Sequence, residues 1–266
     1  MIYEFFARTD RGRVRNNNED SVAFDRDAQI AVLADGMGGY NAGEVASAMA
    51  ISLVSVALQS TTTEAPVANT PQARQELQQS LANALNLANA AILTAAQETP
   101  GCRGMGTTLV VGVFRGERLI LGHIGDSRCY RLRDGVLQQI TRDHSWLQEQ
   151  VDAGLMTPQQ AAVSTNGNLV TRALGVEPHV QMEVNEFQVA PNDLFLLCSD
   201  GLTDMVPDAD VADMVRASLP LEEKTNLLVD TANAQGGRDN ISVLLVQAAA
   251  TGGKKRGFMS RLIRAA

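Results

Sequence analysis

Cysteine, aromatic residues and long apolar runs are all scarce in this chain of 266 residues. The three cysteines, Cys102, Cys129 and Cys198, are scattered and show no CxxC spacing. Such a set argues against a disulfide framework and for a reducing compartment. No segment reaches the roughly 18 uninterrupted apolar residues of a membrane span, and the N-terminus lacks the charged start and apolar run of a secretory signal. We therefore expect a cytoplasmic protein.

The composition is otherwise that of an ordinary folded protein, with 45% hydrophobic and 20% charged residues. The length allows one large domain or two small ones. Neither an internal repeat nor a clear linker divides the sequence. We expect one domain over residues 1–248 and a separate tail over residues 249–266.

Charge is divided unevenly between the body of the chain and its tail. The net charge is −8, yet residues 254–266 carry five basic residues and no acid, so the rest of the chain holds about −13. An acidic body disfavours nucleic acid as a partner and favours divalent cations. The tail also holds apolar residues among its cations. This pattern fits either a disordered solubilising tail or a short amphipathic helix in weak contact with a membrane surface or a partner.

The spacing of apolar residues predicts an α+β protein. Strand-like runs cover residues 2–7, 21–24 and 30–34, and helical patterns cover 43–59 and 72–97 with a polar loop between them. Residues 107–140 then read as the four strands of a β-meander. The rest of the chain reads as two short helices broken at Gly154 with Thr157 as a cap, a strand over 193–200, helices over 207–219 and 221–235, and a strand over 240–248.

Aspartates recur at the ends of these predicted strands: Asp20, Asp35, Asp126, Asp200 and Asp239. Taken singly, an aspartate before glycine or serine after a strand is first of all a turn signal. Asp35 and Asp200 give the stronger signal because each precedes a glycine after a fully apolar run. If the strand ends converge, the like charges repel by several kcal/mol unless cations neutralise them.

The available ligands indicate which cation such a cluster would bind. Carboxylates, a backbone carbonyl and water suit Mg²⁺ or Mn²⁺, whereas zinc favours histidine or cysteine at close spacing, which this sequence lacks. Gly36 has no Cβ and can turn its carbonyl toward a metal. Arg15, five residues before Asp20, can clamp two phosphate oxygens, although a solvated loop arginine explains it as well.

Eight short motifs occur in an order that resembles one known family. They are RNNNED (15–20), ADGMGG (34–39) with GEVAS (43–47), MGTTL (105–109), GDSRCYR (125–131), TRDHS (141–145), TRALG (171–175), CSDGLTD (198–204) and GGRDNISV (236–243). The chain resembles the bacterial metal-dependent protein serine/threonine phosphatases, the PPM or type 2C family, over about residues 2–247. The resemblance implies an α-β-β-α sandwich of two antiparallel sheets flanked by helix pairs. It also implies a metal cleft at one edge and a variable flap over about residues 147–169 that shapes substrate access.

The resemblance also implies a role for each site residue. Asp35 would bridge two Mn²⁺ or Mg²⁺ ions, and Gly36 would add its carbonyl. Asp200 and Asp239 would ligate one ion, and Asp20 would act through bound water. A weaker third ion would lie between Asp126 and Asp200, and Arg15 would bind the phosphate. A metal-bridged water would then hydrolyse phosphoserine or phosphothreonine in proteins, reversing a serine/threonine kinase.

Tyr40 departs from the family pattern, in which a histidine usually follows DGMGG and is proposed to protonate the leaving group. A phenol of pKa about 10 is poorly matched to that task at neutral pH. A slower enzyme, a metal-bound water as acid, or another histidine such as His123 or His144 would each account for the change. We favour retained activity because every metal position is intact.

Other functions are compatible with parts of the sequence. A catalytically weak regulator that binds phosphoproteins is the main alternative, because of Tyr40, and a metal-dependent phosphodiesterase is a nearer one. A nucleotide-binding protein is disfavoured because the sequence contains neither GxxxxGK[ST] nor GxGxxG. The complete set of metal positions favours the phosphatase, since a pure binder has no chemical reason to keep it.

Overall fold

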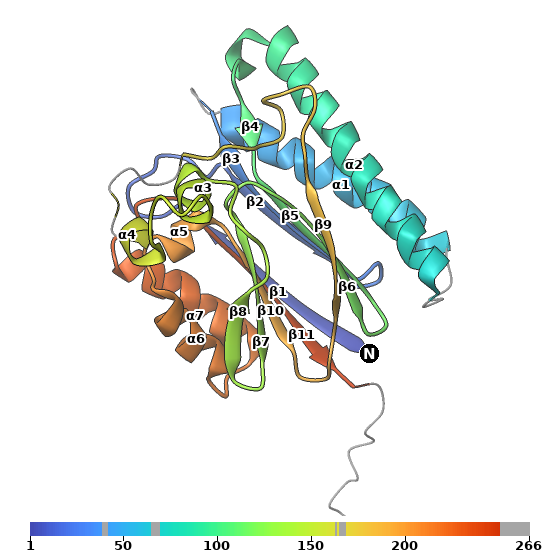
Figure 1. Ribbon diagram of the computed structural model, residues 1–266, viewed down its shortest axis with the longest axis vertical. Coiled ribbons are helices and arrows are strands. Elements are labelled where there is room, and N and C mark those ends of the chain that lie inside the picture. Colours follow the sequence, from blue (N-terminus) through green and yellow to red (C-terminus); the bar gives the residue numbers. More distant parts are fainter. Residues whose placement is uncertain (39–41, 65–69, 163, 165–168, 251–266) are drawn as a thin grey trace, which may run out of the picture.

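A computed structural model describes the backbone of residues 1–38, 42–64, 70–162, 164 and 169–250. These residues form two antiparallel sheets stacked face to face, with helices on both outer faces (Figure 1). The α-β-β-α sandwich predicted from the sequence is confirmed. The tail from residue 251 onward lies outside the described residues.

The first sheet joins the two ends of the described chain. Its strands, in spatial order, are β1 (Ile2–Asp10), β11 (Ile241–Ala249), β10 (Leu194–Cys198), β7 (Arg128–Arg133) and β8 (Val136–Gln139). Helices α6 (Asp208–Arg216) and α7 (Leu221–Ala234) cover its outer face. Leu228 and Val229 of α7 belong to the same buried cluster as Leu196 and Leu245 of the sheet. This apolar contact fixes the helix pair on the sheet.

The second sheet is built mainly from the N-terminal half of the chain. Its strands, in spatial order, are β2 (Asp20–Asp25), β3 (Ile30–Met37), β5 (Leu109–Arg115), β6 (Arg118–Ile124) and β9 (Glu183–Gln188), with β4 (Gly106–Thr107) paired to β3. Helices α1 (Ala42–Glu64) and α2 (Pro71–Glu98) cover its outer face, and the short helix η1 (Pro100–Cys102) follows them. Residues 42–60 of α1 have the length and hydropathy of a membrane span, yet the helix packs on β2, β3 and α2 as a core helix does.

The space between the sheets is filled by aromatic and branched side chains. Phe114 from the second sheet lies edge-on to Phe5 and Phe195 from the first, with ring centroids 5.9 and 5.4 Å apart. All three rings are at most 1% exposed. Each such burial contributes roughly 1.5–3 kcal/mol relative to exposure, so this layer is a main source of the stability of the sandwich.

Two predictions about the elements are wrong. Helix α1 continues to Glu64, five residues past its predicted end, so the predicted polar loop is shorter than expected. The four strands predicted for residues 107–140 exist, but they form no single meander. β5 and β6 pair in the second sheet, whereas β7 and β8 pair in the first. The chain crosses between the sheets at residues 125–127, and the sequence of a strand does not say which of two stacked sheets it joins, so the pattern could not reveal the crossing.

The helices expected around Gly154 are present as α3 (Trp146–Asp152) and α4 (Pro158–Ala162). The Thr157 hydroxyl accepts a hydrogen bond from the Gln160 amide, as a helix cap does. Strand β9 and helix α5 (Asp200–Thr203) were not expected from the sequence. Figure 1 shows α3 and α4 beside α5, at the edge of the sandwich where several strands end.

Candidate metal centre

Asp20 and Asp35 face each other across two neighbouring strands. Asp20 opens β2 and is paired directly with Asp35 of β3. Asp20 is 7% exposed; its Oδ2 accepts a hydrogen bond of 2.8 Å from the Ser199 hydroxyl, and its Oδ1 is buried with no partner among the described residues. Burial, above all, raises the pKa of Asp20 to about 6. The pair therefore brings two carboxyl groups to one point of the second sheet.

Asp35 is held in place through its backbone. Its amide donates to the Thr108 hydroxyl at 3.0 Å, and its carbonyl accepts from the Thr108 amide and the Thr107 hydroxyl, each at 2.9 Å. Burial raises the pKa of Asp35 well above its usual range, and the charges of Asp20 and the other cluster aspartates raise it further. The two threonines lie in the MGTTL motif, but the sequence alone assigned them no role.

Gly36 meets a steric condition that no other residue would satisfy. A Cβ atom built on Gly36 would lie 2.1 Å from the Gly43 carbonyl oxygen and 2.5 Å from that of Glu19. Any side chain would therefore force apart the strand, the start of α1 and the loop before β2. The backbone packing that places Asp35 requires glycine at the next position.

Asp200 and Asp239 come from the first sheet. Asp200 opens α5 directly after β10, and Asp239 stands two residues before β11, the neighbour of β10. Burial raises the pKa of Asp200 well above its usual range, and the charges of Asp126 and other aspartates add to the shift. Asp126 lies in the crossing between the sheets, is 6% exposed, and has its pKa raised to about 7, mainly by burial. The structure thus brings all five predicted aspartates together.

Arg15 lies at the border of this cluster. Its Nη2 atom is 2.6 Å from Oδ2 of Asp239, and its side chain is about half exposed. The loop that carries it is tied down by Asn240, whose side-chain amide donates to the Arg11 and Asn17 carbonyls and accepts from the Glu19 amide. The sequence did not assign this role to Asn240, although it lies in the GGRDNISV motif.

The donor set fits divalent Mg²⁺ or Mn²⁺. Five carboxyl groups from two sheets meet in one place, and the charges that raise the pKa of Asp35 and Asp200 are those of other aspartates. A cation would relieve this repulsion, and oxygen donors are the ligands these ions prefer. The buried Oδ1 atom of Asp20 gives the cluster an acceptor that faces no protein donor among the described residues. These carboxyl groups can hold such ions in their deprotonated state.

A groove of about 1010 Å³ leads away from the carboxyl groups. Asp126, Asp200 and Asp239 lie in its wall, and α3 and α4 supply apolar side chains to it, including Leu147, Val151 and Pro158. Most of the flap predicted over 147–169 is described, and this part borders the groove. Residues 163 and 165–168 lie outside the described residues.

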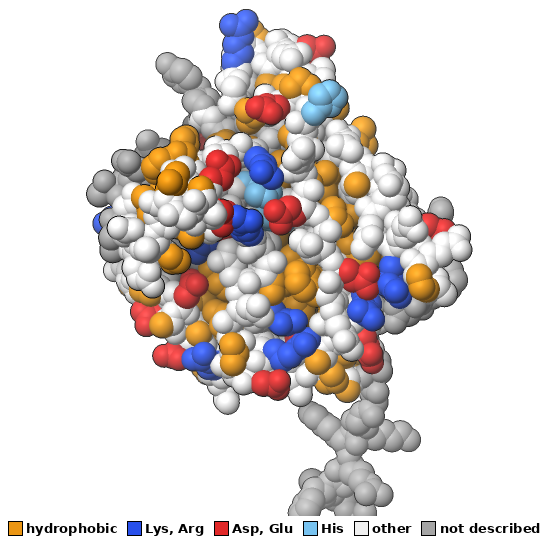
Figure 2. All heavy atoms as spheres, viewed as in Figure 1, with side chains coloured by type: hydrophobic (Ala, Val, Ile, Leu, Met, Phe, Trp, Pro, Cys, Tyr) orange, Lys and Arg blue, Asp and Glu red, His pale blue; other side chains and the backbone are white. Residues whose placement is uncertain are grey.

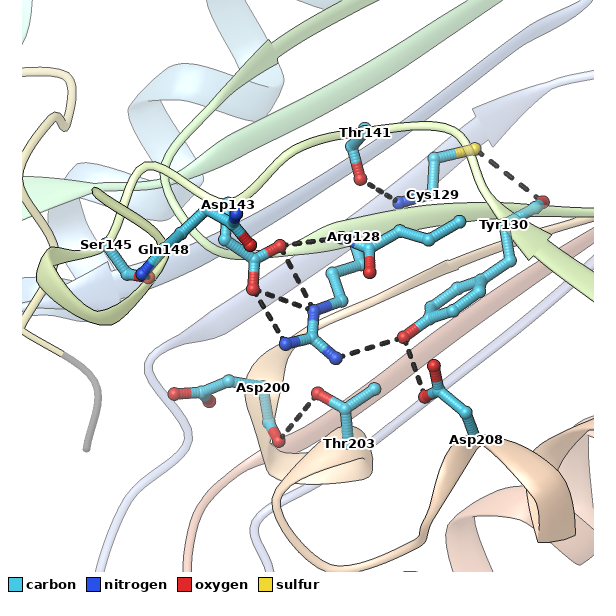
Figure 3. A network of polar contacts seen from close by, with 11 residues as sticks. Arg128, Cys129, Tyr130, Thr141, Asp143, Ser145, Gln148, Asp200, Thr203 and Asp208 are labelled. Carbon is cyan, nitrogen blue, oxygen red and sulfur yellow. Dashed lines mark hydrogen bonds and ion pairs between the residues drawn. The ribbon is translucent and has the colours of Figure 1, made fainter. Parts of the chain in front are cut away.

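A network of polar contacts joins the groove to the root of the flap (Figure 3). Arg128 binds Asp143 through two nitrogens, at 2.9 and 2.7 Å, and its Nη1 donates to the Tyr130 hydroxyl. That hydroxyl donates in turn to Asp208 of α6 at 3.0 Å. Burial acts to lower the pKa of Arg128, but its contacts with Tyr130 and Asp143 outweigh burial and raise that pKa, so this cation is satisfied by its own neighbours.

Histidines and a glutamate meet outside this groove. One ligand atom from each of His123, His144 and Glu183 lies within 4.8 Å of the other two. The sequence lacks a close spacing of histidines, and these residues meet only in the fold, where His123 lies on β6, Glu183 on β9 and His144 in the segment before α3. Neither histidine is among the residues lining the groove, and both are buried. The idea that one of them replaces the missing histidine at position 40 gains no support, and Tyr40 lies outside the described residues.

Comparisons with known proteins agree with this geometry. A sequence profile of the protein phosphatase 2C family matches residues 10–235. The serine/threonine phosphatase stp of Listeria innocua is 39% identical over 243 residues, covering 90% of this chain and 94% of its own length. The serine/threonine protein phosphatase PstP of Mycobacterium tuberculosis is 40% identical over 248 residues, which are 92% of this chain and 45% of PstP.

Solved structures show the same fold. The crystal structure of the Mycobacterium tuberculosis phosphatase PstP/Ppp superposes with a TM-score of 0.85 at 37% identity, covering 94% of this chain and 100% of that one. A second structure, the PstP catalytic domain in complex with two manganese ions, gives a TM-score of 0.81 at 38% identity, with 94% and 99% covered. The two manganese ions belong to that PstP structure. In this chain, the feature suited to such ions is the cluster of five aspartates described above.

Proposed function

The chain belongs to the protein phosphatase 2C family, and from that premise we propose that it hydrolyses phosphoserine and phosphothreonine in proteins at a centre of two Mn²⁺ or Mg²⁺ ions. The observation that carries the proposal is the convergence of five carboxyl groups, with raised pKa values on four of them, beside Arg15 at one end of an open groove. Relatives named as serine/threonine phosphatases support the same activity.

Each carboxyl group has a proposed place in this centre. Asp35 is central, since all four other aspartates act on it electrostatically, and we assign it to both ions together with the Gly36 carbonyl. Asp200 and Asp239 would hold one ion from the first sheet, and Asp20 would act through an intervening water. When bound, the two ions supply an activated water and offset negative charge on the phosphate. Asp126 with Asp200 would hold a weaker third ion.

The protein's own groups orient the substrate. Arg15 is exposed enough to reach a phosphate, and its guanidinium can give two parallel hydrogen bonds to the phosphate oxygens. The apolar side chains of α3 and α4 can contact the chain on either side of the phosphorylated residue. The groove is open to solvent and has a volume of about 1010 Å³, which favours a segment of a protein as substrate over an enclosed small molecule.

The proposed activity implies two kinds of partner. The substrates would be phosphorylated proteins, and a serine/threonine kinase would supply them. The cytoplasmic location and the weak membrane or partner contact of the tail over 249–266 stay predictions, as does the domain over residues 1–248.

The first test is phosphate release from a phosphothreonine and a phosphoserine peptide with Mn²⁺, with Mg²⁺ and with excess EDTA. Asp35→Asn is the variant, and Asp27→Asn, in the exposed turn at the far end of the same strand pair, is the matched control. We expect release that requires metal, that Asp35→Asn abolishes and that Asp27→Asn retains. Folded wild-type protein that binds phosphopeptide but releases no phosphate with either metal would instead support the regulator. Release from a phosphodiester but not from either peptide would support the phosphodiesterase.

Tyr40 allows a sharper test of the leaving-group chemistry. Without a histidine acid, the enzyme should retain more activity on aryl phosphates, whose leaving groups need no proton, than on phosphoserine. We expect Tyr40→His to raise phosphoserine turnover relative to aryl-phosphate turnover, by up to about 10²-fold. An unchanged ratio would show that position 40 plays no part in protonating the leaving group.

A further inference from the structure

The His144 side chain bridges the sheet crossing and strand β9. Its Nδ1 atom accepts a hydrogen bond of 3.1 Å from the Gly125 amide, and its Nε2 atom lies 3.3 Å from Oε1 of Glu183. A neutral imidazole has one nitrogen that accepts and one that donates. Because the amide can only donate, the proton belongs on Nε2, which then donates to Glu183. The two neighbours together select one tautomer of His144.

His144 holds both peptide groups of Gly125. Besides the bond to the side chain, the backbone amide of His144 donates to the Gly125 carbonyl at 2.8 Å. Gly125 has φ +102°, and a Cβ there would lie 2.6 Å from Cβ of Thr108, so only glycine fits this crossing. Asp126 follows directly. The direction in which the Asp126 carboxyl group enters the groove therefore depends on a turn that His144 clamps from both sides.

The same backbone segment is tied to the root of the flap. The His144 carbonyl accepts from the Thr171 amide at 2.9 Å, and Ser145 forms a β-bridge with Val170. Figure 2 shows acidic, basic and histidine side chains gathered on the face beside α3. His144 is 5% exposed beneath this surface, whereas its partner Glu183 is 37% exposed, so the bond to the Gly125 amide is the more shielded of its two side-chain contacts.

A zinc site formed by His123, His144 and Glu183 is the obvious alternative. A histidine nitrogen binds a metal through its lone pair, but the lone pair on Nδ1 of His144 is engaged by the Gly125 amide and Nε2 carries the proton. His123 and Glu183 would remain, and two ligands are fewer than a structural zinc site uses. His123 instead packs against the His144 ring at 4.8 Å, with both of its nitrogens buried and unpartnered among the described residues.

We propose that His144, in the tautomer fixed by Glu183, is a positioning residue that orients Asp126 for binding the weaker third cation. The inference rests on the proposed function, because it assigns Asp126 to that cation. It predicts that the acceptor at Nδ1 matters more than the donor at Nε2. A Glu183–His144–Gly125 relay of hydrogen bonds thus connects β9 to the metal cleft.

Two substitutions separate the nitrogen atoms of His144. In His144→Asn, the side-chain oxygen takes the place of Nδ1 and can accept from the Gly125 amide, but it cannot reach Glu183. In His144→Gln, the amide group takes the place of Nε2 and can donate to Glu183, but it leaves the Gly125 amide unpaired. His123→Phe is the control, because it keeps the ring packing and removes only unpartnered nitrogens.

The main readout is Mn²⁺ binding measured by electron paramagnetic resonance of the free ion, without substrate. The third site is defined as the weak site that Asp126→Asn removes. We expect His144→Gln to weaken that site by about 10–100-fold, the usual cost of losing an outer partner of a metal ligand. His144→Asn should remain within about threefold of wild type, and His123→Phe should not differ from it.

A second readout does not involve metal. In EDTA, the Gly125 amide should keep its protection from hydrogen exchange in His144→Asn and lose it in His144→Gln. If His144→Gln does not fold, Glu183→Ala takes its place, and we expect it to weaken the third site about three- to tenfold because the His144 ring loses the acceptor that holds its Nε2 side in place. In that case a third site unchanged by Glu183→Ala overturns the proposal.

Several outcomes would overturn the inference, and they can be told apart from failure of the proposed function. Equal effects of the asparagine and glutamine variants would reduce His144 to a structural residue. Stoichiometric Zn²⁺ binding that requires His123, His144 and Glu183 would show that the cluster is a metal site. A weak Mn²⁺ site that survives Asp126→Asn would refute the role of Asp126 while two tight sites and phosphate release remain. Absence of all Mn²⁺ binding would refute the proposed function itself.

Discussion

Carboxyl groups are used in opposite ways in two adjacent regions of this molecule. In the cleft, burial and the charges of neighbouring aspartates raise the pKa values of Asp35 and Asp200, and Arg15 pairs with Asp239 at the border. At the flap root, Asp143 is 9% exposed at its side chain and is held by two nitrogens of Arg128. The cleft is suited to binding metal cations from solution, whereas at the flap root the protein supplies the cation itself, as Arg128. The difference shows that an acidic cluster points to a metal only where the protein does not supply the matching charge.

The largest effect should follow from removing a charge in the cleft. Asp200→Asn takes away an oxygen donor, and we expect phosphate release with saturating Mn²⁺ to fall on the order of 10³-fold, equivalent to several kcal/mol of transition-state stabilisation. The same change should stabilise the protein in EDTA, since it relieves repulsion. Steady-state kinetics and urea unfolding of one preparation measure both quantities. A loss of stability in EDTA would contradict the view of the cleft as a set of repelling charges.

The same substitution at the flap root should have the opposite effect on stability. Asp143→Asn leaves the half-buried Arg128 without its ion pair, and losing a hydrogen bond between charged groups typically costs about 1.5–3 kcal/mol. Urea unfolding in EDTA measures the difference from Asp200→Asn directly. Asp213→Asn, in an exposed pair with Arg216, is the control and should change stability by less than about 1 kcal/mol. If Asp143→Asn and Asp200→Asn shift stability in the same direction, the contrast between the two regions is wrong.

The pH should affect the cleft in a way that depends on metal. Asp20 and Asp126 have pKa values raised from 3.8 to about 6 and about 7, so between pH 4 and 7 the folded metal-free protein holds protons that the unfolded chain releases. These two groups therefore lower the free energy of unfolding in EDTA as the pH rises, each by about 1.4 kcal/mol per pH unit, up to about pH 6 for Asp20 and about pH 7 for Asp126. The buried His123, with its pKa lowered to about 4, offsets part of this fall below about pH 6.5. With Mn²⁺ the trend should reverse, because ions replace protons. Urea unfolding at about pH 5 and about pH 7.5 tests this, and rising stability in EDTA would count against it.

The smallest expected effect comes from trimming the network at the flap root. Tyr130→Phe removes the hydroxyl that accepts from Arg128 and donates to Asp208, while the ring stays buried. We expect a loss of about 1–2 kcal/mol of unfolding free energy, since the ion pair with Asp143 remains. Thermal unfolding with and without Asp143→Asn forms a double-mutant cycle. Strictly additive effects would mean that the network does not act as a unit.

The sequence predicted most of the fold and most of the cleft, for identifiable reasons. The apolar runs before Asp35 and Asp200 mark buried strands, and a strand end next to an aspartate is a local signal. Strand β9 was missed because its residues are only partly buried at an edge of the sheet and alternate weakly. The crossing at residues 125–127 was missed because nothing local says which sheet a strand joins.

The supporting residues of the cleft were harder to find than the carboxyl groups. The side chains of Thr108, Asn240 and His144 act through hydrogen bonds with backbone atoms that are distant in sequence. Such contacts depend on where the partner lies in space, and no spacing along the chain encodes them. The meeting of His123 with His144 escaped for the same reason, since the two residues lie on different elements.

The cleft aspartates are shared between the two sheets, with Asp20 and Asp35 on one and Asp200 and Asp239 adjoining the other. Cations held by both sets would therefore cross-link the two sheets along one edge of the sandwich. The opposite edge is joined without metal, by apolar contact between the layers and by hydrogen bonds from Tyr3 to the Gly116 carbonyl and from Arg133 to the Gln188 carbonyl. Resistance to force and to heat would then differ between the two edges. The concentration of free metal would set how strongly the two sheets are held together at the cleft, and it would have little effect at the opposite edge.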